Sequence, residues 1–505
     1  MKRLSIHHLG IVSMLMIALL LATLAPSINS VFAEAPPWDG NFHYYAVGSM
    51  VSYEGSEYRC LQAHTSQPAW TPPTTPALWQ LVSGSPSPTN TPSATVVPPT
   101  STPPPNPTAT TTLPPTPTSV TPPPSGKRII GYFVQWGVYG RNYHVKNIKT
   151  SGSASKLTHI NYAFSNVVNN RCVIGDSYAD YEKAYTAAES VDGVADTWDQ
   201  PLRGSFNQLR KLKAQYPHLK VLISLGGWTW SSGFSDAALP QNRVAFVQSC
   251  IDLFITDPRW AGVFDGIDVD WEYPGACGNT CNFRPEDTQN FTALLAEFRK
   301  QLNAVRPGLL LTIAAPAGQD KIDKIEVGKI HQHLDFINLM TYDFHGAWEN
   351  TTNFQSNLYT PAGDPAQGNQ RVSVDQAVRA WRQGGTPAGK LVVGVPFYGR
   401  GWQGVPSANN GLWKTGSGAA SGTYEAGIED YKVLKAKGYP RYFNNDAQAA
   451  WIYSNGIFWT YDDPSVMNTK TNYINTNSLG GAMFWELSGD TTNGELINAL
   501  SNGLR

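Results

Sequence analysis

The sequence predicts an α/β fold in which residues 127–505 form a (β/α)8 barrel. Eight apolar, β-rich runs recur along this region, and helical patterns such as 206–216, 243–256 and 288–305 lie between many of them. This alternation favours a parallel sheet, and eight strands favour a closed barrel with insertions. An open doubly wound sheet is the alternative, but no glycine-rich phosphate loop follows the first run.

The eight predicted strands follow one another at 128–135, 157–166, 219–225, 263–271, 309–315, 336–342, 391–397 and 480–486. Strands of a parallel barrel are buried on both faces, which explains why these runs are almost continuously apolar. The long interval between the seventh and eighth runs is rich in glycine and aromatic residues. We therefore expect a small α+β insertion at about 399–473.

The fourth run ends in a row of carboxylates, Asp268, Asp270 and Glu272, which begins after Asp265. Side chains alternate between the faces of a strand, so these three point the same way and lie roughly 6–7 Å apart. Three such groups inside a fold cannot all ionise, and at least one should hold a proton near neutral pH. A protonated carboxyl group beside an ionised one is the pair of groups with which glycosidases break a glycosidic bond. Asp265 is expected to cap the strand.

Composition and spacing argue against charged or metallic partners. The net charge is −1, which gives no electrostatic case for nucleic acid or an anionic membrane, whereas 16 Trp and 23 Tyr suit a neutral, ring-shaped polymer or a large aromatic core. An Asp-x-Asp pair can bind Mg²⁺ or Ca²⁺, but such a site would need more ligands nearby, and no Cys/His spacing predicts zinc. A buried ion-pair network, with Arg400 as the main partner, is another interpretation of the carboxylates. We expect neither a metal nor a cofactor.

The first 33 residues have the pattern of a secretory signal peptide. Lys2 and Arg3 precede an apolar stretch at 9–25, and cleavage is expected after Ala33. An uncleaved membrane anchor is the alternative. No other stretch is long and apolar enough to span a bilayer. We expect an exported monomer that is free of the membrane once the signal is removed.

Export permits disulfides between the five cysteines. Cys277 and Cys281 bracket a short Gly/Asn loop after the carboxylates, which predicts a small staple there. A Cys172–Cys250 pair is possible, although the spacing gives it no support. Cys60 would then remain as a buried thiol.

A linker at 84–126, rich in Pro, Thr and Ser, separates the barrel from a small module at 34–83. Such sequence cannot bury a core, so we expect an extended spacer that can carry O-linked glycans.

Four motifs fall on the predicted strands: S-x-G-G at 224–227, D-x-x-D-x-D-x-E at 265–272, M-x-Y-D at 340–343, and Trp485 at the end of the eighth run. Together they resemble glycoside hydrolase family 18, the chitinases. The resemblance implies a secreted, endo-acting enzyme that hydrolyses β-1,4 bonds between N-acetylglucosamine units of chitin and its oligomers with retention. The alternatives are an endo-β-N-acetylglucosaminidase acting on N-glycans and a non-catalytic chitin-binding lectin, although such lectins typically lack the acid at Glu272.

The resemblance also implies a role for each matching residue. Glu272 would be the general acid, and no second carboxylate would be the nucleophile, because the substrate's 2-acetamido oxygen attacks the anomeric carbon to give an oxazolinium intermediate. Asp270 would orient the acetamido group and share a proton with Asp268. Tyr342 would donate to the acetamido oxygen, and Trp485 would form the floor under the sugar. The expected supporting or lining residues are Tyr132, Ser224, Met340 and Asp343.

Aromatic residues past the strand ends predict a row of sugar subsites. The family places Trp228 and Trp348 on the leaving-group side and Trp136 on the other side. Core packing is the alternative for each of them, and for Trp402 the two are evenly balanced. The 394–402 stretch resembles a bacterial subgroup with a deepened cleft, which makes Tyr398 and Arg400 further candidates for substrate binding.

The small module resembles chitin-binding modules of the family 5/12 type, through stretches such as 51–55, 58–60 and 77–80. A module of this size has little core, so Val51, Tyr58 and Trp79 are expected to pack it. Trp70, in a proline-fixed loop, and Trp38 are the expected chitin-binding residues.

Overall fold

The computed structural model describes residues 35–39, 44–45, 48–61, 64–65, 71–74, 78–83 and 126–504. The expected signal peptide, linker residues 84–125 and Trp70 lie outside the described residues. The chain divides into two compact units, Met1–Thr112 and Leu113–Arg505. Among the described residues, no helix combines the length and the apolar character needed to cross a bilayer.

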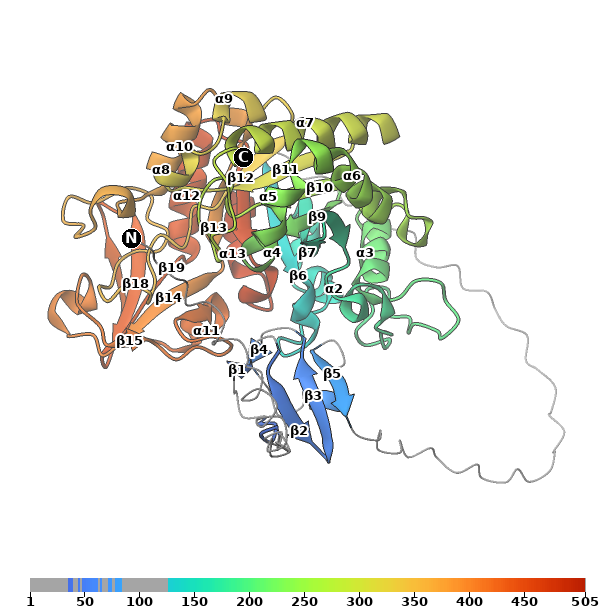
Figure 1. Ribbon diagram of the computed structural model, residues 1–505. Helices are drawn as coiled ribbons and strands as arrows, with labels where there is room; N and C mark the ends of the chain where they lie inside the picture. Colours follow the sequence, from blue (N-terminus) through green and yellow to red (C-terminus); the bar gives the residue numbers. More distant parts are fainter. Residues whose placement is uncertain are drawn as a thin grey trace, which may run out of the picture. The chain divides into compact units, whose positions relative to one another are not determined.

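Eight parallel strands close into a TIM barrel in the larger unit (Figure 1). They are β6 (Arg128–Val134), β7 (His159–Val168), β9 (Lys220–Gly226), β10 (Gly266–Asp270), β11 (Leu310–Ala315), β12 (Phe336–Leu339), β13 (Leu391–Pro396) and β20 (Gly481–Trp485). β20 pairs with β6, and β6 with β7, which closes the ring. Each strand overlaps one of the eight apolar runs, so the predicted fold class is confirmed.

Helices surround the barrel strands (Figure 1). The longer ones are α2 (Val145–Thr150), α3 (Gly204–Gln215), α6 (Pro240–Ile251), α7 (Asp287–Val305), α10 (Val374–Gln383), α12 (Pro464–Thr476) and α13 (Glu495–Gly503), and single turns form α4 (Gly227–Trp230), α5 (Phe234–Ala237), α8 (Gln319–Ile322) and α9 (Val327–Ile330). Local sequence fixes several starts: the Asp463 carboxylate accepts the backbone N–H of Val466, and Pro464 opens α12. Ser373 caps α10 in the same way.

The interval between β13 and β20 folds into the expected insertion. Its strands are β14 (Tyr398–Gln403), β15 (Gly418–Ala419), β16 (Ile428–Asp430), β17 (Arg441–Asn444), β18 (Ala449–Ser454) and β19 (Ile457–Tyr461), with helix α11 (Tyr431–Ala436). They form one antiparallel sheet around a core of its own, which includes Trp402, Trp451 and Phe458. The sheet ends at Tyr461, and α12 after it packs against β20 and α13 of the barrel.

A disulfide joins Cys172, on the short strand β8 (Arg171–Val173), to Cys250 on α6. Spacing along the chain gives this pair no support, because the two residues meet only once β8 folds back on β7. The Cys277–Cys281 disulfide also forms.

The smaller unit is an all-β module. It consists of a pair, β1 (Tyr44–Tyr45) and β4 (His64–Thr65), and an antiparallel sheet of β2 (Met50–Tyr53), β3 (Ser56–Cys60) and β5 (Trp79–Ser83). Its core contains Val51, Tyr58, Cys60 and Trp79, as expected of a small, aromatic-rich fold. Trp38 is half-buried and packs edge-on against Tyr53, with ring centroids 5.4 Å apart.

Candidate active site

The carboxylate row runs from the barrel interior outwards. Asp268 and Asp270 lie in β10 and are buried, with exposed fractions of 0% and 2%. Glu272 follows two residues past the end of the strand and is only half-buried. Asp265, at the other end, accepts hydrogen bonds from the Val221 N–H (2.8 Å) and from Lys213, which is the capping role expected of it. The row therefore places one carboxyl group where a substrate can reach it, above two that are enclosed.

Asp268 is held by donors from five other barrel strands. Its Oδ2 accepts from Tyr132, Asn161 and Ser224 at 2.7, 2.8 and 2.9 Å, and its Oδ1 accepts from Thr312 and, at 3.4 Å, from Asn338. The family resemblance implies this supporting role for Tyr132 and Ser224. Asn161, Thr312 and Asn338 were missed, although polar residues within otherwise apolar strands are a signal for an interior network. This network fixes the orientation of Asp268 and, through it, the surroundings of Asp270.

Asp270 combines a raised pKa with an unused oxygen. Its pKa lies well above the usual value, first because it is buried and then because the Asp268 carboxylate beside it is negatively charged. Its Oδ2 accepts from the Tyr132 hydroxyl at 3.1 Å, whereas its buried Oδ1 has no partner among the described residues. Buried polar atoms are normally paired, so this oxygen is available to a ligand.

Glu272 has the pKa of a general acid. Its pKa is raised to about 8: burial is the largest cause, a hydrogen bond with Tyr273 opposes the rise, and the negative charge of the Asp343 carboxylate adds to it. The group therefore carries its proton at neutral pH. Its backbone N–H donates to the Ser231 hydroxyl at 2.9 Å, which anchors the acid to the segment after β9.

The segment after β12 forms one wall of the site. Tyr342 and Met340 are half-buried there, and the Tyr342 hydroxyl donates to the Met483 sulfur at 3.7 Å. Asp343 has a positive φ of 57° and accepts from the Tyr398 hydroxyl (2.7 Å) and from Arg400 Nε (2.8 Å). The polar ends of Tyr398 and Arg400 are thus used to hold this strained residue in place.

The candidate tryptophans differ in how far they are buried. Trp485 is the expected floor of the site, three others are exposed, and Trp402 lies in a core. Trp485 is half-buried and stacks on Phe164, with centroids 5.9 Å apart, and Trp136 lies 6.2 Å from it. The exposed fractions are 40% for Trp136, 53% for Trp228 and 59% for Trp348. The Arg400 guanidinium lies over the Trp348 ring, 5.0 Å from its centroid. Trp402 is fully buried in the insertion and donates to the Glu349 carbonyl, so it packs a core. Phe164 was not predicted.

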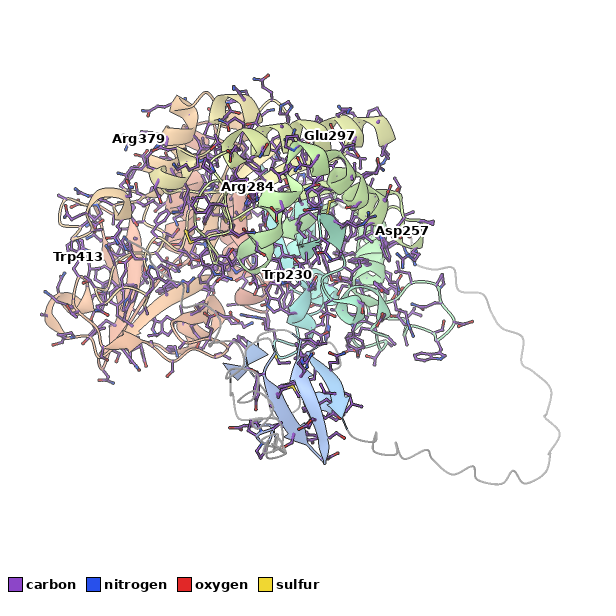
Figure 2. All side chains as sticks on the ribbon, in the orientation of Figure 1. Trp230, Asp257, Arg284, Glu297, Arg379 and Trp413 are labelled. Carbon is purple, nitrogen blue, oxygen red and sulfur yellow. A yellow bond between two sulfur atoms is a disulfide. The ribbon has the colours of Figure 1, made fainter. Side chains whose placement is uncertain are left out.

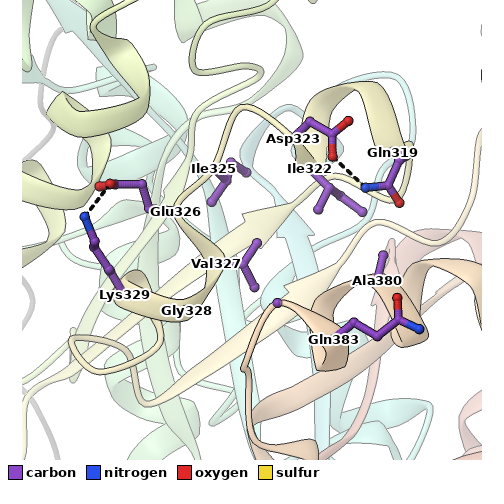
Figure 3. A pocket seen from close by; sticks show the side chains of 11 residues that line it. Gln319, Ile322, Asp323, Ile325, Glu326, Val327, Gly328, Lys329, Ala380 and Gln383 are labelled. Carbon is purple, nitrogen blue, oxygen red and sulfur yellow. Dashed lines mark hydrogen bonds and ion pairs between the residues drawn. The ribbon is translucent and has the colours of Figure 1, made fainter.

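Two cavities differ in their relation to this site. One of about 70 Å³ is lined by Asp343, Tyr398, Arg400 and Trp485 and belongs to it. Another of about 500 Å³ lies between α8, α9 and α10 and shares no residue with the site (Figure 3). Among its polar side chains, Glu326 pairs with Lys329 and Gln319 with Asp323.

A (β/α)8 barrel whose fourth strand leads to a protonated glutamate above two enclosed aspartates has the site of a glycoside hydrolase. The family model of glycosyl hydrolases family 18 matches residues 128–490, and the chain belongs to this family. The model of carbohydrate-binding module family 5/12 matches residues 38–80.

Two chitinases from Streptomyces species are similar to this chain over most of its length. Chitinase 63 of Streptomyces plicatus is 50% identical over 76% of this chain and 62% of its own length, and chitinase C of Streptomyces lividans is 52% identical over 72% and 58%. The chain thus spans about three fifths of the length of these relatives. The catalytic domain of psychrophilic chitinase B from Arthrobacter TAD20 matches with a TM-score of 0.73 and 42% identity, over 75% of this chain and 95% of that one.

Proposed function

We propose that the chain is a secreted chitinase that hydrolyses the β-1,4 bonds of chitin with retention, assisted by the substrate's own acetamido group. Asp270 carries this proposal. A nucleophilic carboxylate must be ionised and must reach the anomeric carbon, whereas Asp270 is buried and has a raised pKa. Its unpartnered Oδ1 instead suits the acetamido N–H of a sugar in the site.

The steps of the proposed hydrolysis follow from which carboxyl groups of the site hold a proton. Glu272 gives its proton to the glycosidic oxygen while the acetamido oxygen bonds to the anomeric carbon, and the C–O bond to the leaving sugar breaks. Asp270 accepts the acetamido N–H, and the proton that it shares with Asp268 moves onto Asp268, so that Asp270 carries the one negative charge that balances the oxazolinium ring. Glu272, now ionised, takes a proton from water. The water oxygen attacks the anomeric carbon on the face that the leaving sugar occupied, and the bond from that carbon to the acetamido oxygen breaks, which opens the oxazolinium ring. The new reducing end is the β-anomer.

The remaining residues position the sugar. Tyr342 donates to the acetamido oxygen, Trp485 forms the floor, and Met340 and Asp343 line the pocket. Trp228 and Trp348 serve the leaving-group side and Trp136 the other side, because their exposed rings can stack on the C–H faces of sugars.

The module at 34–83 targets insoluble chitin through Trp70 and Trp38, residues 84–126 are the linker, and residues 1–33 direct secretion. The match to a carbohydrate-binding family supports this division. The catalytic region is expected to act as a monomer.

A second glycosidase activity has a specific observation in its favour. A family 18 N-acetylglucosaminidase from Paenibacillus barengoltzii matches with a TM-score of 0.60 and 31% identity, over 75% of this chain and the whole of that one. An N-acetylglucosaminidase would release single N-acetylglucosamine units, whereas an endo-β-N-acetylglucosaminidase would cleave within the core of an N-glycan. Product analysis on chitin oligomers and on an N-glycan separates these activities from an endo-acting chitinase.

The variant Glu272→Gln tests the assignment. We expect kcat on chitin oligomers to fall by about 10²–10⁴-fold, because general acid catalysis is lost, while chitin binding persists. Glu297→Gln on α7 is the matched control (Figure 2 labels Glu297), since the Glu297 carboxylate accepts hydrogen bonds from Lys300 and Gln301 on its own helix. A thiazoline mimic of the oxazolinium ring should inhibit competitively. Unchanged turnover in Glu272→Gln would refute the proposal.

A further inference from the structure

The backbone of Glu272 is clamped on its N–H side by the segment after β9. Its N–H donates to Ser231 Oγ at 2.9 Å, and the same hydroxyl lies 3.0 Å from the Asp270 carbonyl and 2.8 Å from the Gly227 carbonyl. Ser231 is buried and opens the turn η5 (Ser231–Gly233). One side of the acid's main chain is therefore fixed by a buried residue.

Gly278 lies against the peptide group that follows Glu272. A Cβ added to this glycine would lie 2.2 Å from the carbonyl oxygen of Glu272, 2.9 Å from its carbonyl carbon and 3.5 Å from the N of Tyr273. These three nearest atoms belong to one peptide group, the one that leaves Glu272. The φ of Gly278 lies outside the left-handed region, so close approach and not backbone conformation explains the glycine here.

The loop that carries Gly278 has little packing to hold it. No residue between 276 and 286 is buried. Loops with so few buried contacts are normally the mobile parts of a structure. Another constraint is needed if this loop is to keep its backbone against Glu272.

The Cys277–Cys281 disulfide supplies that constraint. It closes a ring of five residues that contains Gly278, and the Gly278 N–H donates to the Thr280 carbonyl at 3.0 Å inside the ring. Next to the ring, the Asn282 side chain donates to the Ser232 carbonyl, beside the residue that clamps the Glu272 N–H. Arg284 donates to the Ser235 carbonyl at 2.7 Å; Figure 2 labels Arg284 on this loop and Trp230 on the facing segment.

We propose that Gly278, held by the Cys277–Cys281 disulfide, is a positioning residue for Glu272. The inference rests on the proposed role of Glu272 as the acid. The peptide group that Gly278 touches sets the direction of the Glu272 side chain, and acid catalysis depends on that direction: displacements of about 1 Å can cost about 10²-fold in rate. Gly278 contacts the enzyme backbone, so the effect falls on kcat more than on KM.

Two variants test the proposal on soluble chitin oligomers. Cys277→Ser/Cys281→Ser removes the staple and leaves the Cys172–Cys250 disulfide intact. Gly278→Ala keeps the staple but pushes on the Glu272 peptide group. We expect both to lower kcat by about 10–100-fold with KM changed less than about twofold. Gly389→Ala is the control, since a Cβ there meets no atom within 4 Å, and it should match the wild type.

Thermal melting, measured alongside, separates positioning from folding. If the double variant melts early, Gly278→Ala decides the question, because it adds one methyl group and removes no crosslink. Wild-type kcat in folded Gly278→Ala, or a loss confined to KM, would overturn the proposal. Failure of the proposed function itself is recognised separately, by an inactive wild type or an active Glu272→Gln.

Discussion

At the scale of single residues, the Glu272 proton depends on Asp343. The nearby Asp343 carboxylate helps to raise the pKa of Glu272 to about 8, after the larger effect of burial. A general acid works while protonated, so kcat/KM should fall as the pH rises through about 8. Activity is thus expected to extend to mildly alkaline pH and no further.

Replacing that charge should move the alkaline limit. In Asp343→Asn one cause of the raised pKa disappears, so the fall in kcat/KM should occur at lower pH than in the wild type. The amide oxygen can still accept from Tyr398 and Arg400, which preserves the wall. Asp323→Asn, in the separate cavity beside α8, is the control and should leave the pH profile unchanged. An identical profile for Asp343→Asn would contradict this electrostatic link.

At the scale of elements, α12 carries a buried cation that supports the wall of the site. Lys470 is fully buried and donates to Asp462 and, at 2.6 Å, to Ser356 Oγ. The Ser356 hydroxyl in turn donates to the carbonyl of Thr341, the residue before Tyr342, at 2.7 Å. Burial raises the pKa of Asp462 to about 6, so the lysine is needed to balance its charge.

Lys470→Met should therefore destabilise the barrel by about 3–5 kcal/mol, because it leaves a buried carboxylate without its partner. Lys300→Met removes an exposed lysine paired with Glu297 and should cost less than about 1 kcal/mol. Urea unfolding of both variants measures the difference. Equal stability in the two variants would show that the buried pair contributes little.

The elements also show what the sequence can predict and where it stops. Apolar runs identified all eight barrel strands, because burial on both faces leaves a strong local signal. The interior donors Asn161, Thr312 and Asn338 were missed, since each is a single polar residue whose partner comes from a distant strand. Trp402 could be placed only by the tertiary packing of the insertion, and Cys172–Cys250 only by the β7–β8 hairpin. Local patterns thus give the strands, while contacts between distant segments decide the surroundings of the site.

At the scale of the whole molecule, the proposed division of labour assigns substrate capture to the small module. Deleting residues 34–126 should weaken activity on insoluble chitin far more than on soluble oligomers, because only the solid substrate gains from a tethered second contact. The catalytic region alone, measured on both substrates, checks this. Equal losses on both would deny the module a targeting role.

The central claim is that the substrate's acetamido group, and no protein carboxylate, attacks the anomeric carbon. Proton NMR of chitin oligomers in the first minutes of hydrolysis, before the anomers interconvert, tests the stereochemistry of that attack most directly. The account predicts that the new reducing ends appear as the β-anomer. The acetamido oxygen and then water each displace a group at the anomeric carbon, and two inversions restore its configuration. New ends that appear first as the α-anomer would contradict it.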